Sequence, residues 1–422
     1  MNSETHIALD EQARAILIGN DRGGYTVPTD GLYPYQWNWD SAFAAAGFAT
    51  FDIPRAWAEV ETLFGGQWPS GMVPHILFHR PDPGYFPGPD VWGARLGPIP
   101  SSGISQPPVA ATFIRDIYEA DREAGADHLA RLYPKMLAWH RWFMDWRADA
   151  NGAIFITHPW EAGRDNCPDW DQAMAAIDPV GVGEYTRRDT SHVNPEMRPT
   201  KEDYDRYIWL VQRGRRLGWD EAAMAQDAPF KVADPTMTFI LLRANRDLLA
   251  LAKAMGEDGA EIEGWISRLE TGVESLRNPE TGLFDAVNLN TGDHTGALSN
   301  ASFLCWYAGI DDGAMVEALA RTYASSRYPV PSHAVDAKGF NPQRYWRGPT
   351  WAIMNAMIGR GLADMGRVQD AEHLKAATRA LIASHGFAEY FHPHTGDPAG
   401  GGMFTWTAAV WLAWASPSAE GK

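Results

Sequence analysis

Apolar residues recur every three to four positions through most of this chain, and this periodicity restricts the folds that it can adopt. A helix with one buried face carries apolar residues at i, i+3, i+4 and i+7, whereas the alternation typical of strands is scarce here. We therefore expect an all-α protein. The pattern predicts helices over residues 5–18, 39–49, 53–65, 106–122, 127–147, 203–217, 234–255, 258–276, 297–307, 311–325, 350–364, 367–384 and 403–415.

Two of these helices carry additional start signals. Proline is favoured in a first helical turn because its missing N–H is not needed there, so Pro107 and Pro108 are placed in the first turn of 106–122. Asp234 and Pro235 are predicted as the N-cap and first residue of 234–255.

Long polar-aromatic loops and short turns alternate between the helices, without a strict short repeat. This alternation predicts that six helical hairpins close into a double ring, a helical toroid, with the long loops at one mouth. Residues 1–422 are expected to form this single domain. The segments 81–104 and 178–200 are long connections, which are usually functional in compact domains, so we expect them to form lids or substrate loops.

The charge balance argues against several classes of partner. Lys and Arg total 36 against 53 Asp and Glu, a formal charge of -17, which disfavours nucleic acid or an anionic membrane as partner. No apolar run reaches membrane-spanning length, and no basic-plus-apolar signal opens the sequence. Two cysteines, Cys167 and Cys305, do not make a disulfide framework. These features predict a cytoplasmic protein.

Tryptophan is unusually abundant, with 19 residues. Many are expected to pack in the core, but several have Gly, Pro, Asn or Asp as neighbours in the sequence. An indole in such a setting is favoured to line a cleft, with its face offered to a ligand ring. The tryptophans in these settings are Trp37, Trp39, Trp68, Trp92, Trp160, Trp346 and Trp351.

Two carboxylates stand out among aromatic residues. The stretch "HPWEAGRDNCPDWDQA" (158–173) contains Asp165, and "GFAEYFHPHTGDPAGGG" (386–402) contains Glu389. Carboxylates mixed with aromatic rings suit a ligand with hydroxyls and apolar faces, such as a sugar. Glycoside hydrolysis needs two carboxyl groups, one that protonates the leaving oxygen and one that activates water or attacks the sugar. If Glu389 faces inward, desolvation will raise its pKa, which suits acid–base work.

Four motifs together carry a family resemblance: "YPYQWNWDSAF" (33–43), "WEAGRDN" (160–166), "YWRGPTWAIMN" (345–355) and "EYFHPHTGDPAGGGMFTWTAA" (389–409). They resemble the inverting α-glycosidases of glycoside hydrolase family 63 and their trehalase relatives. The resemblance implies an (α/α)6 barrel, with Asp165 as general acid and Glu389 as general base. The chain is too short for the extra domains of larger members, and is similar to the bacterial branch that hydrolyses mannosylglycerate and glucosylglycerate. Many relatives differ at Arg164, beside the acid.

The same resemblance implies further properties. Inversion requires a water between base and sugar, so the two carboxyl groups are expected roughly 6.5–9.5 Å apart rather than about 5–5.5 Å. No cofactor and no metal is expected, and the bacterial branch allows a homo-oligomer. The candidate substrate-binding residues are Tyr35, Trp37, Trp39, Asp40, Gln67, Trp68, His75, Gln106, Trp160, Gly163, Arg164, Tyr204, Arg206, Trp346, Arg347 and Trp351.

Several of these candidates have a plain structural alternative. Asp40 could cap the following helix instead of holding sugar hydroxyls, and Gln106 could cap another. His75 has a second histidine four residues on, His79, but without a third ligand a hydrogen bond is favoured over zinc. Arg347 could pair with an acidic catalytic residue.

The kind of leaving group that the protein binds is expected to depend on segment 184–209, which contains four arginines and three tyrosines. An arginine fork with a tyrosine hydroxyl can hold a carboxylate such as that of glycerate. Arg206 and Tyr204 are the favoured pair, with Arg198 next, and the alternative is that these arginines only offset nearby acids on a solvated surface. A neutral disaccharide or glucosylglycerol is the second substrate hypothesis.

Other functions on helical toroids fit the sequence less well. Sugar epimerases use histidines as acid and base, whereas the motifs here centre on carboxylates. Terpene cyclases carry a D-D-x-x-D motif, which does not occur. A non-catalytic carbohydrate-binding protein would not need two carboxylates in separately elaborated loops.

Overall fold

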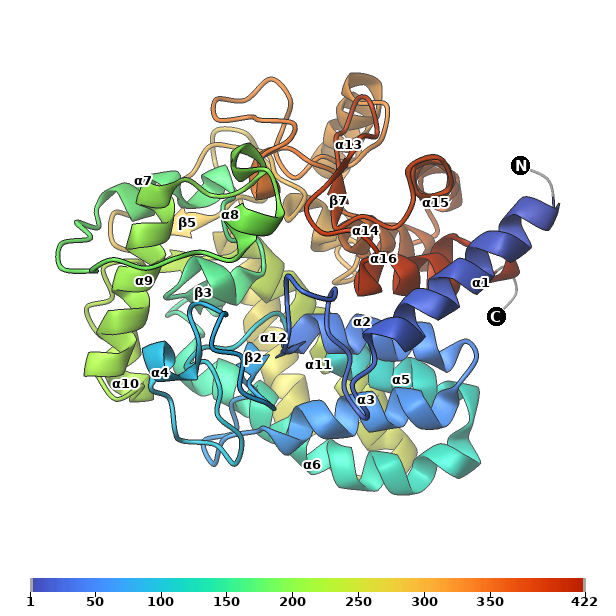
Figure 1. Ribbon diagram of the computed structural model, residues 1–422, viewed down its shortest axis with the longest axis horizontal. Helices are drawn as coiled ribbons and strands as arrows, with labels where there is room; N and C mark the ends of the chain where they lie inside the picture. Colours follow the sequence, from blue (N-terminus) through green and yellow to red (C-terminus); the bar gives the residue numbers. More distant parts are fainter. Residues whose placement is uncertain (1–2, 420–422) are drawn as a thin grey trace.

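The structure, a computed structural model, describes residues 3–419 (Figure 1). Helices make up most of it. They are α1 (Ser3–Asn20), α2 (Asn38–Ala49), α3 (Ile53–Gly65), α4 (Pro89–Trp92), α5 (Ala110–Ala120), α6 (Arg122–Trp146), α7 (Asp171–Ala175), α8 (Asp189–His192), α9 (Lys201–Arg216), α10 (Glu221–Ala225), α11 (Pro235–Met255), α12 (Ala260–Ser275), α13 (Gly313–Ser325), α14 (Ala352–Asp364), α15 (Val368–His385) and α16 (Thr405–Val410).

The strands are two residues long and form three small antiparallel sheets. β1 (Gln36–Trp37) pairs with β2 (Ile76–Leu77), and β7 (Tyr390–Phe391) pairs with β8 (Pro398–Ala399). The third sheet has the order β3-β4-β5-β6 and consists of β3 (Phe155–Ile156), β4 (Val232–Ala233), β5 (Val287–Asn288) and β6 (Asp293–His294).

Six segments pack side by side in a closed ring. In order they are α16, α2, α5, α11, the 3-10 helix Ser302–Cys305 and α14, which returns to α16. A second helix packs behind each of them: α1 behind α16, α3 behind α2, α6 behind α5, α12 behind α11, α13 behind the 3-10 helix and α15 behind α14. The last α-helix of the chain, α16, therefore lies beside the first two, α1 and α2 (Figure 1).

Local sequence explains where the principal helices begin. Asp234 caps α11 by accepting hydrogen bonds from the Thr236 and Met237 amides, and Pro235 is the first residue, as predicted. Thr200 and Asp203 form a reciprocal capping box at the start of α9. These caps matter for function, because both helices begin beside the loops described below.

Two helix predictions are wrong. Pro107 and Pro108 lie before α5, which begins at Ala110, because a residue that precedes proline is pushed out of the helical region. The helix predicted over 297–307 is only the 3-10 helix Ser302–Cys305. Ser299 there forms a bridge with His333, which uses backbone groups that an α-helix would need.

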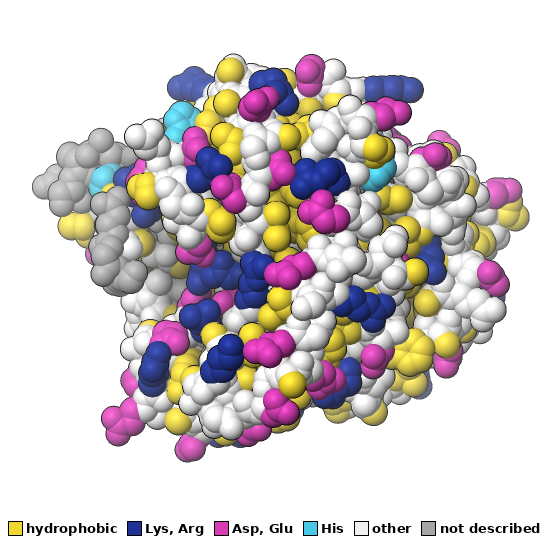
Figure 2. Space-filling view, turned by 180° about the vertical axis from the view of Figure 1, so that it is seen from behind, with side chains coloured by type: hydrophobic (Ala, Val, Ile, Leu, Met, Phe, Trp, Pro, Cys, Tyr) yellow, Lys and Arg dark blue, Asp and Glu magenta, His cyan; other side chains and the backbone are white. Residues whose placement is uncertain are grey.

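The core is continuous and rich in tryptophan, and it runs around the ring. Acidic and basic side chains are interspersed over the face opposite to the view of Figure 1 (Figure 2). None of the helices between residues 3 and 419 is both long enough and apolar enough to cross a membrane.

Candidate active site

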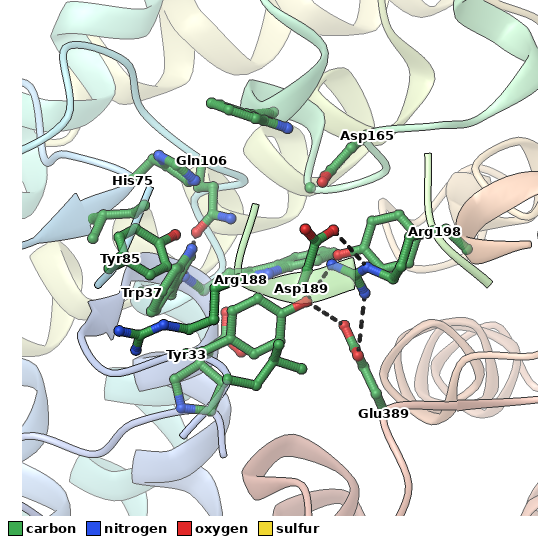
Figure 3. A pocket seen from close by; sticks show the side chains of 18 of the residues that line it. Tyr33, Trp37, His75, Tyr85, Gln106, Asp165, Arg188, Asp189, Arg198 and Glu389 are labelled. Carbon is green, nitrogen blue, oxygen red and sulfur yellow. Dashed lines mark hydrogen bonds and ion pairs between the residues drawn. The ribbon is translucent and has the colours of Figure 1, made fainter. Parts of the chain in front are cut away.

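A pocket lies where loops from distant parts of the chain meet, and it contains about 790 Å³ of empty space, some of it open to solvent. Both predicted carboxylates, Asp165 and Glu389, line it. In Figure 3 they enter from opposite sides, with the guanidinium of Arg198 close to Glu389.

Asp165 follows a tightly constrained turn. The 3-10 helix Pro159–Ala162 is capped by His158 and ends at Gly163, whose φ of 67° is left-handed. An added Cβ at Gly163 would come within 2.6 Å of the Trp39 ring, so this wall of the pocket requires glycine. The turn then reverses the chain and places Asp165 at the pocket.

Burial is the main influence on the proton affinity of Asp165. It raises the pKa of this carboxyl to about 7, assisted by the negative charge of Glu389 and opposed by Arg198. A carboxylic acid that keeps its proton near neutral pH can donate it to a leaving oxygen. The electrostatics therefore suit the acid role that the resemblance implies for Asp165.

Arg164 supports the acid loop from behind and does not line the pocket. Its fully buried guanidinium pairs with Asp169 at 2.9 Å and with Asp234 at 3.4 Å. It also donates to the hydroxyl of Thr236 at 2.7 Å. Since Asp234 caps α11, Arg164 connects the acid loop to the start of a ring helix.

Glu389 lies just before β7, and its side chain is 1% exposed. Its Oε1 accepts a hydrogen bond from the Tyr33 hydroxyl at 3.0 Å, and its Oε2 accepts one from the Gly401 amide at 2.9 Å. Burial raises the pKa of Glu389, whereas Arg198 and these hydrogen bonds oppose the rise. The donors stabilise the ionised form that a general base needs.

A third carboxyl, Asp40, also lines the pocket and is 4% exposed. It lies in the first turn of α2, whose N-cap is Trp37 and has no side-chain cap, so Asp40 is not the cap. Burial, and then the charge of Glu389, hold the pKa of Asp40 well above its usual range. A protonated carboxyl can both donate to and accept from sugar hydroxyls.

Aromatic rings form much of the remaining wall. Trp37, Trp39, Trp160 and Trp406 line the pocket directly. Trp346 and Trp351 lie behind them, stacked at a centroid distance of 3.7 Å, and Trp346 contacts the Trp39 ring. These two support the wall instead of contacting the pocket space.

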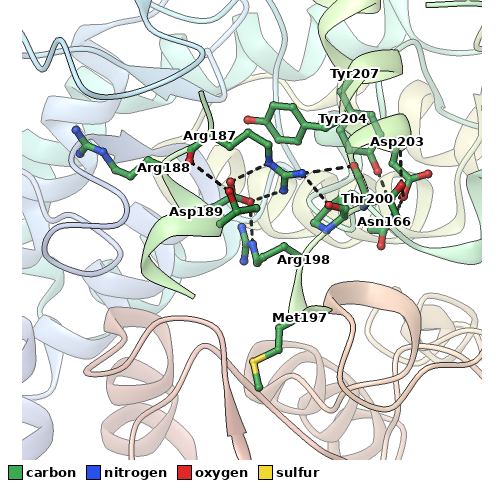
Figure 4. A network of polar contacts seen from close by, with 12 residues as sticks. Asn166, Arg187, Arg188, Asp189, Met197, Arg198, Thr200, Asp203, Tyr204 and Tyr207 are labelled. Carbon is green, nitrogen blue, oxygen red and sulfur yellow. Dashed lines mark hydrogen bonds and ion pairs between the residues drawn. The ribbon is translucent and has the colours of Figure 1, made fainter. Parts of the chain in front are cut away.

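The segment before α9 contributes a charged network to the pocket lining (Figure 4). Asp189 accepts hydrogen bonds from Arg187 at 2.6 Å and from Nε of Arg198 at 3.1 Å. Burial alone would raise the pKa of Asp189, but the two guanidinium groups outweigh it and lower the value. A second ion pair, between Arg188 and Asp82 at 2.5 Å, connects segments 178–200 and 81–104.

The structure brings many of the predicted residues together. Those that line the pocket are Trp37, Trp39, Asp40, His75, Gln106, Trp160, Gly163, Asp165, Tyr204 and Glu389. Oε1 of Gln106 accepts a hydrogen bond from the backbone amide of Trp39 at 3.3 Å. His75 hydrogen-bonds Ser102 at 3.2 Å, and residues 3–419 contain no cluster of three metal-ligating side chains.

Other candidates lie away from the pocket lining. Arg206 pairs with Glu202 at 2.7 Å, on another face of α9, and Arg347 pairs with Asp171 at 2.6 Å instead of a catalytic carboxylate. Gln67 donates to the carbonyls of Gly71 and Lys135. The complete set outside the lining is Tyr35, Gln67, Trp68, Arg164, Arg206, Trp346, Arg347 and Trp351.

Several lining residues were not among the sequence candidates. Tyr33 and Tyr345 are the first residues of two of the motifs, so their position next to the motif tryptophans was an available signal. Arg188 is one of the four arginines of segment 184–209, but nothing in the sequence favours it over the others, and Asp189, the first residue of α8, is one of the acids that these arginines could offset. The lining residues absent from the candidate set include Tyr33, Tyr85, Arg188, Asp189, Tyr345 and Trp406.

Comparison with known proteins identifies the family. Residues 33–407 match a protein-family model, that of the mannosylglycerate hydrolase MGH1-like glycoside hydrolase domain. The chain belongs to this family. It is therefore a glycoside hydrolase, neither an epimerase nor a non-catalytic binding protein, and the resemblance to glycoside hydrolase family 63 is confirmed.

Individual relatives align along nearly the whole chain. A mannosylglycerate hydrolase of Thermus thermophilus is 46% identical over 96% of this chain and 99% of its own. A glucosylglycerate hydrolase of Mycolicibacterium hassiacum is 32% identical over 98% of both chains. The crystal structure of a family 63 mannosylglycerate hydrolase from Thermus thermophilus in complex with Tris superposes with a TM-score of 0.93 at 44% identity, covering 96% of this chain and 99% of that one.

Proposed function

We propose that this glycoside hydrolase cleaves an α-linked glycoside of glycerate, either mannosylglycerate or glucosylglycerate. The observation that carries the proposal is the meeting of Asp165 and Glu389 in one pocket beside the buried guanidinium of Arg198. Two carboxylates supply the acid and base that hydrolysis needs, and the cation can neutralise a substrate carboxylate. The names of the relatives support the same substrate class.

In the proposed reaction Asp165 donates its proton to the glycosidic oxygen as the bond from that oxygen to the anomeric carbon breaks. Glu389 removes a proton from a water whose oxygen forms the new bond to the same carbon. The products are the free sugar, with inverted configuration, and glycerate. Arg198, Tyr33 and the Gly401 amide oppose the rise that burial causes in the pKa of Glu389, and so favour its ionised form before the step.

Arg198 and Tyr204 are the proposed contacts for the glycerate carboxylate. Among the arginines of 184–209, Arg188 and Arg198 line the pocket. Arg206, the arginine favoured from the sequence, pairs with Glu202 outside the pocket lining, so it is not proposed as the contact for the carboxylate. Arg188 is already held by both oxygens of Asp82. The alternative substrate, a neutral disaccharide or glucosylglycerol, would offer Arg198 no charged partner beyond Glu389 and Asp189.

Four further properties complete the proposal. The closed ring and its outer helices are interpreted as an (α/α)6 barrel, with segments 81–104 and 178–200 as lids over the pocket. The two buried free thiols suit the reducing cytoplasm, and a homo-oligomer is compatible with the family.

A substrate panel read by NMR tests the proposal. Mannosylglycerate, glucosylglycerate, glucosylglycerol, trehalose, kojibiose and nigerose would be incubated with the enzyme, and the first anomer released would be recorded. We expect glycerate release with the β-anomer first. Asp165→Asn and Glu389→Gln should each lose on the order of 10²–10⁴-fold in kcat with the fold intact. Hydrolysis of neutral disaccharides alone would establish the alternative, and initial release of the α-anomer would exclude inversion.

A further inference from the structure

Side chains anchor three consecutive backbone carbonyls around the proposed acid. The anchored carbonyls belong to residues 164, 165 and 166, and each donor comes from a different part of the chain. The hydrogen bonds run from Trp170 Nε1 to the Arg164 carbonyl at 2.8 Å, from the Tyr207 hydroxyl to the Asp165 carbonyl at 2.7 Å, and from Arg347 Nη1 to the Asn166 carbonyl at 3.4 Å.

Helix α9 supplies the contact to Asp165 itself. Asp203 and Tyr207 are four residues apart and therefore lie on one face of this helix. Tyr207 donates to the Asp165 carbonyl, while Asp203 accepts a hydrogen bond from the Asn166 side chain at 3.3 Å. Figure 4 shows Asn166, Asp203 and Tyr207 together at this end of the polar network. The helix thus holds two successive residues of the acid loop.

Tyr207 does not line the pocket and is 2% exposed. Its ring packs against His158 and Trp160, which belong to the turn that precedes the acid. The Asp165 side chain extends from this anchored stretch of backbone, so the position of the backbone decides where the proton is delivered. A shift of this loop by a fraction of an ångström would misplace the proton relative to the leaving oxygen.

We infer that Tyr207 is a positioning residue for proton donation, because its hydroxyl fixes the backbone of Asp165 from the surface of α9. The inference rests on the proposed acid role of Asp165. It also gives α9 two tasks, since the neighbouring Tyr204 faces the pocket as a proposed contact for the leaving group. Recognition of the leaving group and its protonation would then depend on one rigid element.

Leaving-group dependence separates positioning of the acid from a general structural role. Glycerate must be protonated as it leaves, whereas fluoride leaves from a glycosyl fluoride with little need for an acid. For Tyr207→Phe, which removes only the hydroxyl, we expect kcat/KM to fall on the order of 10–100-fold on the glycerate substrate. On the matching α-glycosyl fluoride we expect a loss below about threefold. Equal losses on both substrates, or no loss on either, would overturn the inference.

Two additional variants complete the experiment. Tyr323→Phe removes another tyrosine hydroxyl that donates to a backbone carbonyl, that of Asp370 at 3.0 Å, and should change neither reaction. Asn166→Ala removes the hydrogen bonds that the Asn166 side chain donates to Asp203 and to the Tyr207 hydroxyl. It should show the same selective loss, and it tests the inference even if Tyr207→Phe does not fold. Asp165→Asn serves as reference: equal loss on both substrates there would refute the acid role, which is a separate failure of the proposed function.

Discussion

Nη1 of Arg198 lies 3.4 Å from Oε2 of Glu389, and both side chains are almost completely buried. The same guanidinium donates to the Tyr33 hydroxyl at 2.6 Å and lies over the Tyr345 ring at 4.1 Å. One cation therefore faces the proposed base and the proposed binding site for the leaving group. Its removal should affect proton transfer and substrate selection in ways that can be measured separately.

The pH dependence of kcat/KM should report both carboxyl groups. Activity requires a protonated Asp165, so it should fall as the pH rises through about 7, and it requires an ionised Glu389, so it should fall at acid pH. Arg198 lowers the pKa of both groups. Arg198→Gln should therefore move both limbs of the profile to higher pH. Unmoved limbs would show that Arg198 does not act on these two carboxyl groups.

Selectivity for a charged leaving group should also depend on Arg198. Selectivity is the ratio of kcat/KM for glucosylglycerate to kcat/KM for glucosylglycerol. In Arg198→Gln we expect this ratio to fall on the order of 10–100-fold. The variant loses a buried, charged hydrogen bond to the glycerate carboxylate, which glucosylglycerol does not have. Arg206→Gln is the matched control, because Arg206 pairs with Glu202 outside the pocket and should leave the ratio unchanged. Equal losses of kcat/KM on the two substrates would mean that Arg198 does not bind the glycerate carboxylate.

Gly400 should be indispensable to the placement of Glu389. Its φ is +73°, and an added Cβ would overlap Oε2 of Glu389. Gly282 has the same φ, but an added Cβ there would meet nothing within 4 Å. Gly282→Ala thus measures backbone strain alone, about 1 kcal/mol of unfolding free energy. Gly400→Ala should in addition lose most of kcat, and similar activities of the two variants would contradict the prediction.

The buried carboxyl of Asp40 should cost stability at neutral pH. Its pKa is raised in the folded protein, so its contribution to stability is complete below the pKa of the unfolded chain and is lost as the pH rises toward the folded pKa. Asp40→Asn cannot ionise and should match the wild type near pH 4. Above that pH its unfolding free energy should exceed the wild-type value by about 1.4 kcal/mol for each pH unit between the two pKa values. Chemical unfolding at several pH values would measure this, and a constant difference would contradict it.

The sequence allowed prediction of those parts of the site that motifs and periodicity determine. Asp165 and Glu389 follow from two motifs, and the helical ring follows from the spacing of apolar residues. Periodicity wrongly predicted an α-helix over 297–307, where the backbone of Ser299 forms a bridge with His333 instead. It also could not distinguish Arg198 from Arg206, because Arg198 lies in a loop before the Thr200 cap and its direction depends on Asp189 and Glu389.

The junction between the two ends of the chain has a consequence for biosynthesis. Asp10 accepts hydrogen bonds from Trp411 Nε1 and from the Ser416 hydroxyl, both at 2.7 Å, and α16 packs between α2 and α14. A nascent chain can assemble its early helical hairpins on the ribosome, but the gap between α2 and α14 stays open until the segment around residues 405–416 has emerged. The apolar flanks of that gap stay exposed to solvent until then, and apolar surface that is exposed in this way during synthesis is prone to aggregate.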